Sequence, residues 1–344
     1  MCIRDRSNIL LIYTGGTIGM IKDFETGALR NFNFKDLLKY IPELKLLDCD
    51  IATTSFENPL DSSNMKPSYW VDIVTIIEEN YNSFDGFVVL HGSDTMSYTA
   101  SALSFMLENL TKPVIFTGSQ LPIGDLRTDA KENLITSIQV AALSEKGLPK
   151  ITEVCLYFEY KLYRANRTTK INAQHFEAFA SLNYPTLVES GVNLTVNENA
   201  LLPVNRARKL KVHKKMESNI LLVKMFPGID QTTIKHLFDY PELKGLILET
   251  FGSGNITNEV WFLDALKEVI DRGIPVINVT QCSGGTVSMG QYETSFQLKK
   301  MGVISGKDIT TEAALAKLMY LLGQNISVNS FKTIFETSLR GEML

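Results

Sequence analysis

Two hydroxyl groups flank a pair of adjacent glycines near the start of the chain. Thr14 and Thr17 stand on either side of Gly15 and Gly16, directly after the five apolar residues 9–13. The apolar run predicts a buried strand, and the two glycines predict a sharp turn at its end. Glycine lets a ligand approach the backbone closely, and a threonine oxygen can bind a ligand or attack it. This turn is therefore the first candidate for chemistry.

The same arrangement recurs where other predicted strands end. Short polar clusters follow three further apolar runs, at residues 61–63, 92–95 and 118–120. In a parallel sheet the carboxyl ends of the strands share one edge, and ligands bind there. A helix that starts at such a turn carries partial positive charge at its N-terminus, so residues 92–95 suit an anionic or zwitterionic small molecule. Together the clusters favour a site over a purely structural turn.

Phosphate binding is the main alternative for the glycine turn. Its glycines, Gly15, Gly16 and Gly19, do not have the spacing of G-x-G-x-x-G, and no G-K-[ST] follows them. A nucleotide cofactor is therefore not predicted. The next segment, residues 21–33, has no hydrophobic period, so we expect it to form a mobile loop.

Apolar runs and helical periodicity alternate along the chain. The predicted strands are residues 9–13, 49–56, 87–91, 113–117, 154–158, 220–225, 246–249 and 275–280. The predicted helices are residues 34–41, 67–80, 128–144, 258–272, 312–323 and 330–339. A further helix is predicted after residue 95, with Ala100, Leu103, Leu107 and Leu110 facing inward. This alternation is typical of an α/β fold, a mostly parallel sheet with helices on both faces.

The length of 344 residues favours two α/β domains over one. We expect a larger N-terminal domain over residues 8–190, with a Rossmann- or flavodoxin-like, mostly parallel sheet, and a smaller C-terminal α/β domain over residues 218–344. Between them, residues 191–217 end in the basic run 206–215. We interpret this segment as a solvated interdomain linker.

Charge and composition exclude several classes of partner. The 34 Lys and Arg and the 38 Asp and Glu give a net charge of −4 and are spread along the chain, which argues against a nucleic-acid surface or a basic membrane patch. No apolar run approaches the roughly 20 residues that cross a bilayer. Residues 1–8 lack the pattern of a secretory signal. We expect a cytoplasmic protein that contacts neither membrane nor nucleic acid.

Cysteine and histidine spacing predicts neither disulfides nor a metal site. The four cysteines are widely separated and form no C-x-x-C pair, and the four histidines lack the spacing of metal ligands. We therefore expect no metal cofactor.

Five motifs stand in order along the chain. They are T-G-G-T-I-G at residues 14–19, D-S-S at 61–63, H-G-S-D-T-M at 91–96, T-G-S-Q at 117–120 and R-T-T-K at 167–170. Together they resemble the bacterial L-asparaginases, most closely the cytoplasmic type I branch. The resemblance extends through residues 252–255 and 280–282, so it covers almost the whole chain from Asn8.

The resemblance implies hydrolysis of L-asparagine to L-aspartate and ammonia without a cofactor. By motif, Thr17 corresponds to the nucleophile that forms an acyl-enzyme, and Ser93, Asp94 and Lys170 correspond to a second catalytic group. A threonine hydroxyl is a weak nucleophile, so it needs a base and donors for the oxyanion. Backbone N–H groups at the glycine turn and at Ser93 are candidate donors. Whether Lys170 acts as base or as electrostatic organiser stays open.

The resemblance also implies the residues that hold the substrate. Ser62 and Asp94 correspond to the groups that bind the α-carboxylate and α-amine of asparagine, and Asp61, Ser63 and Ser93 lie beside them. Family members are homo-oligomers, so a dimer or tetramer is implied as well. Discrimination between asparagine and glutamine stays open, because one methylene is worth only about 1–3 kcal/mol.

Three positions depart from the family pattern. Ser93 stands where most relatives have threonine, which keeps the hydroxyl, and Ala28 stands where the relatives' loop supplies a tyrosine. Type I relatives can also bind a second asparagine at an allosteric pocket, of which Thr169 and Cys282 remain here. Glu249 replaces the arginine of that pocket. A carboxylate repels the effector's carboxylate, so the sequence argues against allosteric activation.

Two alternative functions remain from different classes. The amidase subunit of a tRNA-dependent amidotransferase shares the motifs but carries an extra N-terminal domain, whereas here the first strand begins by Ile9. A non-catalytic amino-acid-binding sensor is the other, because of the missing tyrosine. We interpret His91 as a packed, hydrogen-bonded core residue, and Arg164 and Arg167 as braces for the loop that carries Lys170.

Overall fold

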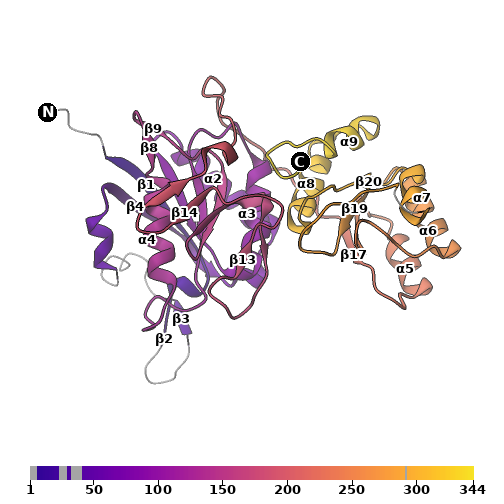
Figure 1. Ribbon diagram of the computed structural model, residues 1–344, viewed down its shortest axis with the longest axis horizontal. Coiled ribbons are helices and arrows are strands. Elements are labelled where there is room, and N and C mark those ends of the chain that lie inside the picture. The colour runs from indigo at the N-terminus through magenta and orange to yellow at the C-terminus, as the bar shows by residue number, and fades with distance from the viewer. Residues whose placement is uncertain (1–5, 23–28, 32–40, 291–292) are drawn as a thin grey trace. The chain divides into compact units, whose positions relative to one another are not determined.

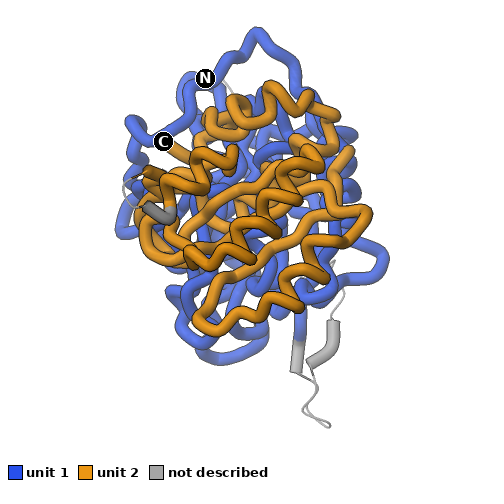
Figure 2. Tube along the Cα trace, turned by 90° about the vertical axis from the view of Figure 1, so that its right-hand side faces the viewer, with its two compact units in different colours: residues 1–214 blue, residues 215–344 orange. Residues whose placement is uncertain are grey.

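The computed structural model describes residues 6–22, 29–31, 41–290 and 293–344. The chain divides into two compact units, Met1–Lys214 and Lys215–Leu344 (Figure 2). Each unit combines a largely or fully parallel sheet with helices (Figure 1). The predicted α/β class, with the larger sheet in the N-terminal part, is confirmed.

The N-terminal unit is built on one eight-stranded sheet. In sheet order the strands are β15 (Leu194–Val196), β14 (Val188–Ser190), β11 (Lys161–Arg164), β10 (Val154–Phe158), β7 (Val114–Thr117), β5 (Gly86–Leu90), β1 (Ser7–Gly15) and β4 (Cys49–Leu60). The strands from β10 to β4 are parallel, and the others are antiparallel. Because β1 lies between β4 and β5, the strand order reverses there, as in flavodoxin-like sheets.

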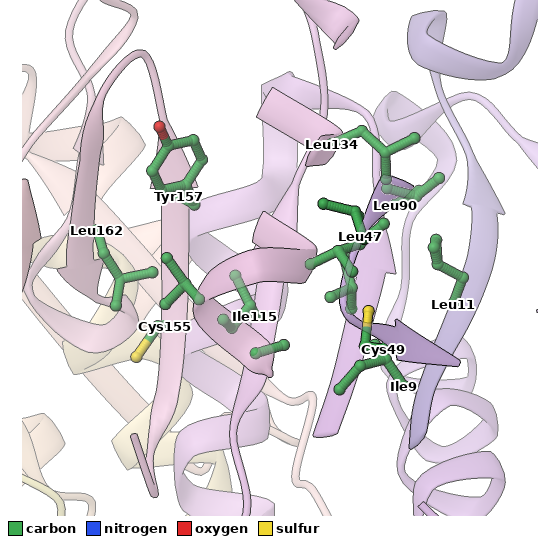
Figure 3. Close-up of a cluster of buried hydrophobic side chains, with 14 of the residues drawn as sticks. Ile9, Leu11, Leu47, Cys49, Leu90, Ile115, Leu134, Cys155, Tyr157 and Leu162 are labelled. Atoms are coloured by element: carbon green, nitrogen blue, oxygen red, sulfur yellow. The ribbon is translucent and has the colours of Figure 1, made fainter. Parts of the chain in front are cut away.

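One face of this sheet carries a large cluster of buried hydrophobic side chains. Alternate residues of the central strands, such as Ile9, Leu11 and Ile115, belong to one cluster of buried side chains with Leu134 of α4 (Ala130–Ala141) (Figure 3). α4 packs on β5, β7 and β10. The period of two along each strand and of 3.6 along the helix accounts for this burial.

The opposite face is covered by α2 (Pro67–Asn80) and α3 (Met96–Met106), which pack against each other. α2 begins with proline in its first turn, where a missing N–H is tolerated. Trp70 is buried and its Nε1 donates to Thr99 Oγ1 of α3 at 3.1 Å. Since β5 is buried along its whole length, helices on both faces are required to cover it.

Shorter elements complete the N-terminal unit. They are β6 (Leu107–Glu108), β8 (Ser144–Glu145), β9 (Leu148–Pro149), β12 (Thr169–Lys170), β13 (Phe179–Ala180), β16 (Lys211–Val212) and the 3₁₀ turns η1 (Thr17–Gly19), η3 (Pro42–Leu46), η4 (Ser62–Asn64), η5 (Ser93–Thr95), η6 (Ala165–Arg167) and η7 (Glu198–Ala200). Three of these turns, η1, η4 and η5, directly follow the carboxyl ends of β1, β4 and β5.

The C-terminal unit has a four-stranded parallel sheet. Its strands, in order, are β17 (Ile220–Lys224), β18 (Gly245–Thr250), β19 (Val276–Thr280) and β20 (Ile304–Ser305). Its helices are α5 (Gln231–Phe238), α6 (Val260–Asp271), α7 (Glu293–Met301), α8 (Thr311–Gly323) and α9 (Val328–Phe335). No helix in the described part of either unit combines the length and apolar character needed to cross a membrane.

Part of the segment 21–33, which the sequence predicts to be a mobile loop, forms paired strands. β2 (Met20–Lys22) pairs with β3 (Leu29–Asn31) in an antiparallel hairpin. Three-residue strands are too short to show a hydrophobic period, and their backbone pairing does not depend on one. Residues 23–28, and nearly all of the predicted helix at 34–41, lie outside the described residues.

The segment 191–217 is not only a linker. Its residues 194–196 form β15 at the edge of the N-terminal sheet, and β16 pairs with β6. The two compact units meet in sequence at residues 214 and 215. Amino-acid composition does not reveal short edge strands of this kind. Their backbone hydrogen bonds form without apolar side chains on both faces of the strand.

Candidate active site

The turn after β1 separates the two threonines by environment. Thr14 is buried, and its Oγ1 donates to Leu90 O of β5 at 2.9 Å. Gly16 has a φ of +88° and donates its N–H to Leu60 O at 3.0 Å. Thr17 follows in η1, partly exposed, and its hydroxyl bonds to no other described residue. The Thr14 oxygen is thus committed to the sheet, whereas the Thr17 oxygen is available.

Three turns meet at this edge of the sheet. A Cβ added to Gly16 would lie 2.5 Å from both Cα and N of Gly92, and a Cβ added to Gly92 would lie 2.5 Å from Ser62 Oγ. Only glycine permits backbones to approach this closely. The turns that carry Thr17, Ser62 and Ser93 are therefore in contact at the β1/β5 switch point, where ligands of such sheets bind.

Ser93, Asp94 and Lys170 form one hydrogen-bonded group. Lys170 Nζ donates to Ser93 Oγ at 2.8 Å and to Asp94 Oδ1 at 2.7 Å. The Lys170 side chain is 18% exposed and the Asp94 side chain 66%. In this geometry Lys170 is a donor, as an ammonium must be. The predicted second catalytic group is therefore assembled from segments 76 residues apart in the chain.

Gln120 belongs to the same network, although its sequence motif assigned it no role. Ser93 Oγ donates to Gln120 Oε1 at 3.3 Å, and Gln120 Nε2 donates to His175 O at 2.9 Å. The backbone N–H of Gln120 donates to Asp129 Oδ2 at 2.8 Å. The available signal was its place directly after β7, the neighbour of β5 in the sheet.

Residues 61–63 divide into an inward and an outward part. Ser62 is buried, and its carbonyl accepts from Thr95 Oγ1 at 2.8 Å. Asp61 Oδ1 accepts from Ser63 N at 2.9 Å and from Ser63 Oγ at 2.8 Å, and these bonds lower the pKa of the Asp61 carboxyl. Asp61 thus caps η4 by accepting from Ser63, and the contact of either residue with a substrate stays a prediction.

His91 directly follows β5 and is completely buried. Its Nδ1 lies 2.7 Å from Gly92 O, and its ring meets Phe116 edge-on with centroids 5.9 Å apart. Burial lowers the pKa of His91 to about 4, so the imidazole is neutral at physiological pH. The interpretation of His91 as a packed, hydrogen-bonded residue is confirmed.

Two arginines precede Lys170 in a largely buried segment. Arg164 Nε donates to Glu153 Oε2 at 2.6 Å, and both side chains are almost fully buried. The guanidinium groups of Arg164 and Arg167 lie 4.3 and 5.2 Å from the ring centroid of Tyr184. The arginines therefore anchor the start of the loop that leads to Lys170, as the sequence predicted.

The residues of the predicted allosteric pocket are distributed over both units. Thr169 lies in β12 of the N-terminal unit, whereas Glu249 and Cys282 belong to the C-terminal unit. Glu249 Oε1 accepts from Thr311 Oγ1 at 2.6 Å, and its Oε2 lies 3.6 Å from Lys224 Nζ. A role of these three residues in effector binding stays a prediction.

Two further expectations concern the loop position Ala28 and metal binding. Ala28, the position of the missing tyrosine, lies outside the described residues. Across residues 6–22, 29–31, 41–290 and 293–344, no cluster of three or more His, Cys, Asp or Glu side chains is arranged to hold a metal ion.

The assembled groups fit acyl transfer. Thr17 supplies a partly exposed hydroxyl, and the Lys170–Ser93 pair supplies a donor and a second hydroxyl. Within the described chain the backbone N–H groups of Thr17 and Ser93 have no hydrogen-bond acceptor. Unpaired N–H groups beside a nucleophile are what an oxyanion requires.

Comparison with known proteins agrees with this chemistry. The family models "Asparaginase, N-terminal" and "Glutaminase/Asparaginase C-terminal domain" match residues 8–202 and 219–335. The chain is 43% identical to L-asparaginase 1 of Escherichia coli (strain K12) over 339 residues, 98% of each chain. It is 40% identical to the 60 kDa lysophospholipase of Mus musculus, over 97% of this chain and 62% of that protein.

A solved structure is similar over nearly the whole chain. L-asparaginase I from Vibrio cholerae O1 biovar eltor str. N16961 superimposes with a TM-score of 0.89 at 42% identity, covering 98% of this chain and 99% of that one. The resemblance predicted from five short motifs is therefore confirmed. This chain belongs to the asparaginase family.

Proposed function

We propose that this protein is a type I L-asparaginase, which hydrolyses L-asparagine to L-aspartate and ammonia. The observation that carries the proposal is the contact of Lys170 Nζ with Ser93 Oγ and Asp94 Oδ1, on a turn that touches the turn of Thr17. The 43% identity to L-asparaginase 1 of Escherichia coli supports the choice of substrate.

The first half of the reaction forms an acyl-enzyme. Thr17 Oγ attacks the side-chain amide carbon of asparagine, and the N–H groups of Thr17 and Ser93 stabilise the oxyanion that develops. The C–N bond then breaks, and the leaving nitrogen takes up the proton that Thr17 has lost, so that ammonia departs. Lys170 donates to Ser93 Oγ and holds the hydroxyl in place beside the reacting amide.

The second half of the reaction regenerates the enzyme. Water attacks the Thr17 ester, the same N–H groups stabilise the second oxyanion, and aspartate leaves as the Thr17 hydroxyl regains its proton. No redox or metal step is needed to balance this sequence.

We infer that Asp94 and Ser62 hold the substrate. Asp94 uses one carboxylate oxygen for Lys170 and is 66% exposed, so its second oxygen is available to the α-ammonium group. Ser62 lies at the start of η4 with its Oγ against Gly92, where a helix-like turn favours the α-carboxylate. Asp61, Ser63 and Ser93 complete the proposed binding set.

The test compares ammonia release from asparagine by wild type and by Thr17→Ala. We expect the substitution to lower kcat at least about 100-fold, the usual effect of losing one essential group. Thr53→Ala, at an exposed position of β4, is the matched control and should leave kcat unchanged. Full activity of Thr17→Ala would refute the nucleophile, and asparagine binding without ammonia release would favour a sensor.

We further propose a cytoplasmic homo-oligomer, either dimer or tetramer, on the basis of the likeness to the type I branch. The proposed domains are residues 8–190, extended by the edge strand at 194–196, and residues 218–344. Light scattering of the purified protein measures the number of subunits. Parallel assays with asparagine and glutamine at equal concentration measure the substrate preference.

A further inference from the structure

We propose that His91 is a positioning residue that orients the Ser93 N–H for the reaction, an inference that rests on the proposed hydrolase function. His91 makes no contact with solvent, because its side chain is 0% exposed. It therefore cannot touch the substrate or transfer a proton to it. Any influence on catalysis must pass through the groups that its ring contacts.

His91 is held both at its ring and at its backbone. The ring meets Phe116 edge-on, with centroids 5.9 Å apart. The backbone N–H of His91 donates to Thr117 O of β7 at 2.9 Å. A Cβ added to Gly118 would lie 2.3 Å from His91 O, so the chain also packs directly on this residue's carbonyl. The backbone of His91 is therefore fixed to the neighbouring strand β7, and its ring packs on Phe116.

One directed hydrogen bond leaves this ring. Nδ1 lies 2.7 Å from Gly92 O, and since a carbonyl oxygen can only accept, Nδ1 must carry the proton. Nε2 is buried and has no partner in the described chain. Burial lowers the pKa of His91 to about 4, so the ring stays neutral near neutral pH. The bond to Gly92 O then keeps the proton on Nδ1.

The bond to Gly92 O determines the direction of the Ser93 N–H. A trans peptide is planar, so its C=O and N–H point in opposite directions. When His91 holds the Gly92 carbonyl, the Ser93 N–H is directed away from the ring. That N–H has no acceptor among the described residues, which leaves it available to an oxyanion.

Close packing makes this orientation matter. Gly16 and Ser62 both pack against Gly92. A Cβ added to Gly16 would lie 2.5 Å from Gly92 Cα, and a Cβ added to Gly92 would lie 2.5 Å from Ser62 Oγ. A rotation of the Gly92–Ser93 peptide would move the donor relative to Thr17 on the adjoining turn. Displacements of about 1 Å in an active site can lower a rate by about 10²-fold.

The rival explanation is that His91 only fills space. Asparagine and leucine are nearly isosteric, and only asparagine can present an N–H to Gly92 O. We expect His91→Leu to lower kcat about 10²-fold with KM changed less than about threefold, since the oxyanion exists only after substrate is bound. His91→Asn should regain at least about tenfold of that loss. L-Aspartate, a ground-state ligand, should bind both variants as it binds wild type.

Controls separate packing and proton transfer from positioning. Phe116→Leu removes the ring contact but keeps the hydrogen bond, so its kcat should remain within about threefold of wild type. The pH profile of kcat for His91→Asn should have the wild-type shape from pH 5 to 9. If His91→Leu does not fold, His91→Met and His91→Gln form a second matched pair.

The outcomes are distinct. Equal loss of kcat in His91→Leu and His91→Asn would assign the residue to packing, and a change in KM alone would assign it to substrate binding; either result overturns the inference. Loss of the acidic limb of the pH profile in His91→Asn would also overturn it. Wild-type protein that releases no ammonia would instead overturn the proposed function itself.

Discussion

Neighbouring residues of one type acquire different chemistry from their surroundings. Thr14 and Thr17 flank the same glycines, but Thr14 Oγ1 donates to a main-chain carbonyl inside the sheet and Thr17 Oγ has no such bond in the described chain. A hydroxyl that satisfies a buried carbonyl contributes about 1 kcal/mol to stability. A hydroxyl that makes no such hydrogen bond is available to react.

Ser93 stands where most relatives have threonine, and two variants test the role of its hydroxyl. Its Oγ accepts from Lys170 and donates to Gln120, and a threonine hydroxyl can do both. Ser93→Thr should keep kcat within about threefold, whereas Ser93→Ala loses a bond to a charged group worth about 1.5–3 kcal/mol, or about 10–100-fold in kcat. Steady-state ammonia release measures both, and an alanine variant as active as the threonine variant would contradict the role.

Glu159 predicts a dependence of stability on pH. Its side chain is 8% exposed, and burial, followed by the charges of Asp129, Glu132 and Glu177, raises its pKa from 4.5 to about 7. Between these values the unfolded chain releases the proton that the folded chain keeps, so the unfolding free energy falls as pH rises. The contribution is fully present below pH 4.5 and lost by pH 7, about 3 kcal/mol in all.

Glu159→Gln tests this dependence, because glutamine cannot ionise. Urea unfolding of wild type and variant at pH 5, 6, 7 and 8 should show the variant gaining stability relative to wild type as pH rises, with no further gain above about pH 8. A difference that stays constant across this range would show that the pKa of Glu159 is not raised.

At the level of elements, the site depends on turns that touch. η1, η4 and η5 follow neighbouring parallel strands, and the glycines between them allow backbone contact. Each strand supplies one functional segment, and the reversal of strand order between β1 and β5 leaves room for a ligand. Conformation at Gly16 is therefore as important as the identity of Thr17.

Gly16→Ala should inactivate the enzyme. The φ of +88° and the 2.5 Å approach of an added Cβ to Gly92 require the Thr17 and Ser93 turns to separate, and we expect kcat to fall at least about 100-fold. Gly147→Ala is the matched control, because Gly147 has a φ of +77° but open space around its Cβ position.

The control should lose about 1 kcal/mol of stability, measured by urea unfolding, with kcat unchanged. Equal kcat for both alanine variants would show that contact between the turns is unimportant. The comparison thus separates backbone strain, which both variants share, from the steric conflict that only Gly16→Ala creates.

Element prediction succeeded where apolar periodicity was long. The sequence predicted residues 67–80 and 154–158, and α2 and β10 have those bounds. It missed the β2–β3 hairpin and β15, whose strands have three residues each. Three residues are too few to show a hydrophobic period. Whether such a strand forms depends on the strand that it pairs with.

At the level of the whole molecule, each compact unit has its own stabilising interactions. In the C-terminal unit Lys317 and Glu342 form an ion pair in which both side chains are 0% exposed. Lys317 Nζ also donates to Thr337 O at 2.7 Å, and Glu342 accepts from the N–H groups of Leu339 and Arg340. The pair therefore ties the last residues of the chain to α8.

Breaking this pair should destabilise the protein strongly. Lys317→Met leaves the Glu342 carboxylate buried without its counter-charge, which typically costs about 3–5 kcal/mol of unfolding free energy. Lys317→Met combined with Glu342→Gln removes both charges and should recover part of the loss. Urea unfolding measures the three proteins, and a double variant no more stable than the single one would show that the buried charge is not the cause.

The sequence alone established the α/β class, the family and the motifs that carry the candidate residues. These features are local, since periodicity and glycine turns lie within a few consecutive residues. Contacts between distant segments required the folded chain: Lys170 with Asp94, Gln120 with Ser93, and His91 as the support of Gly92. Sheet order and backbone packing determine which strand ends meet, and no local pattern encodes that.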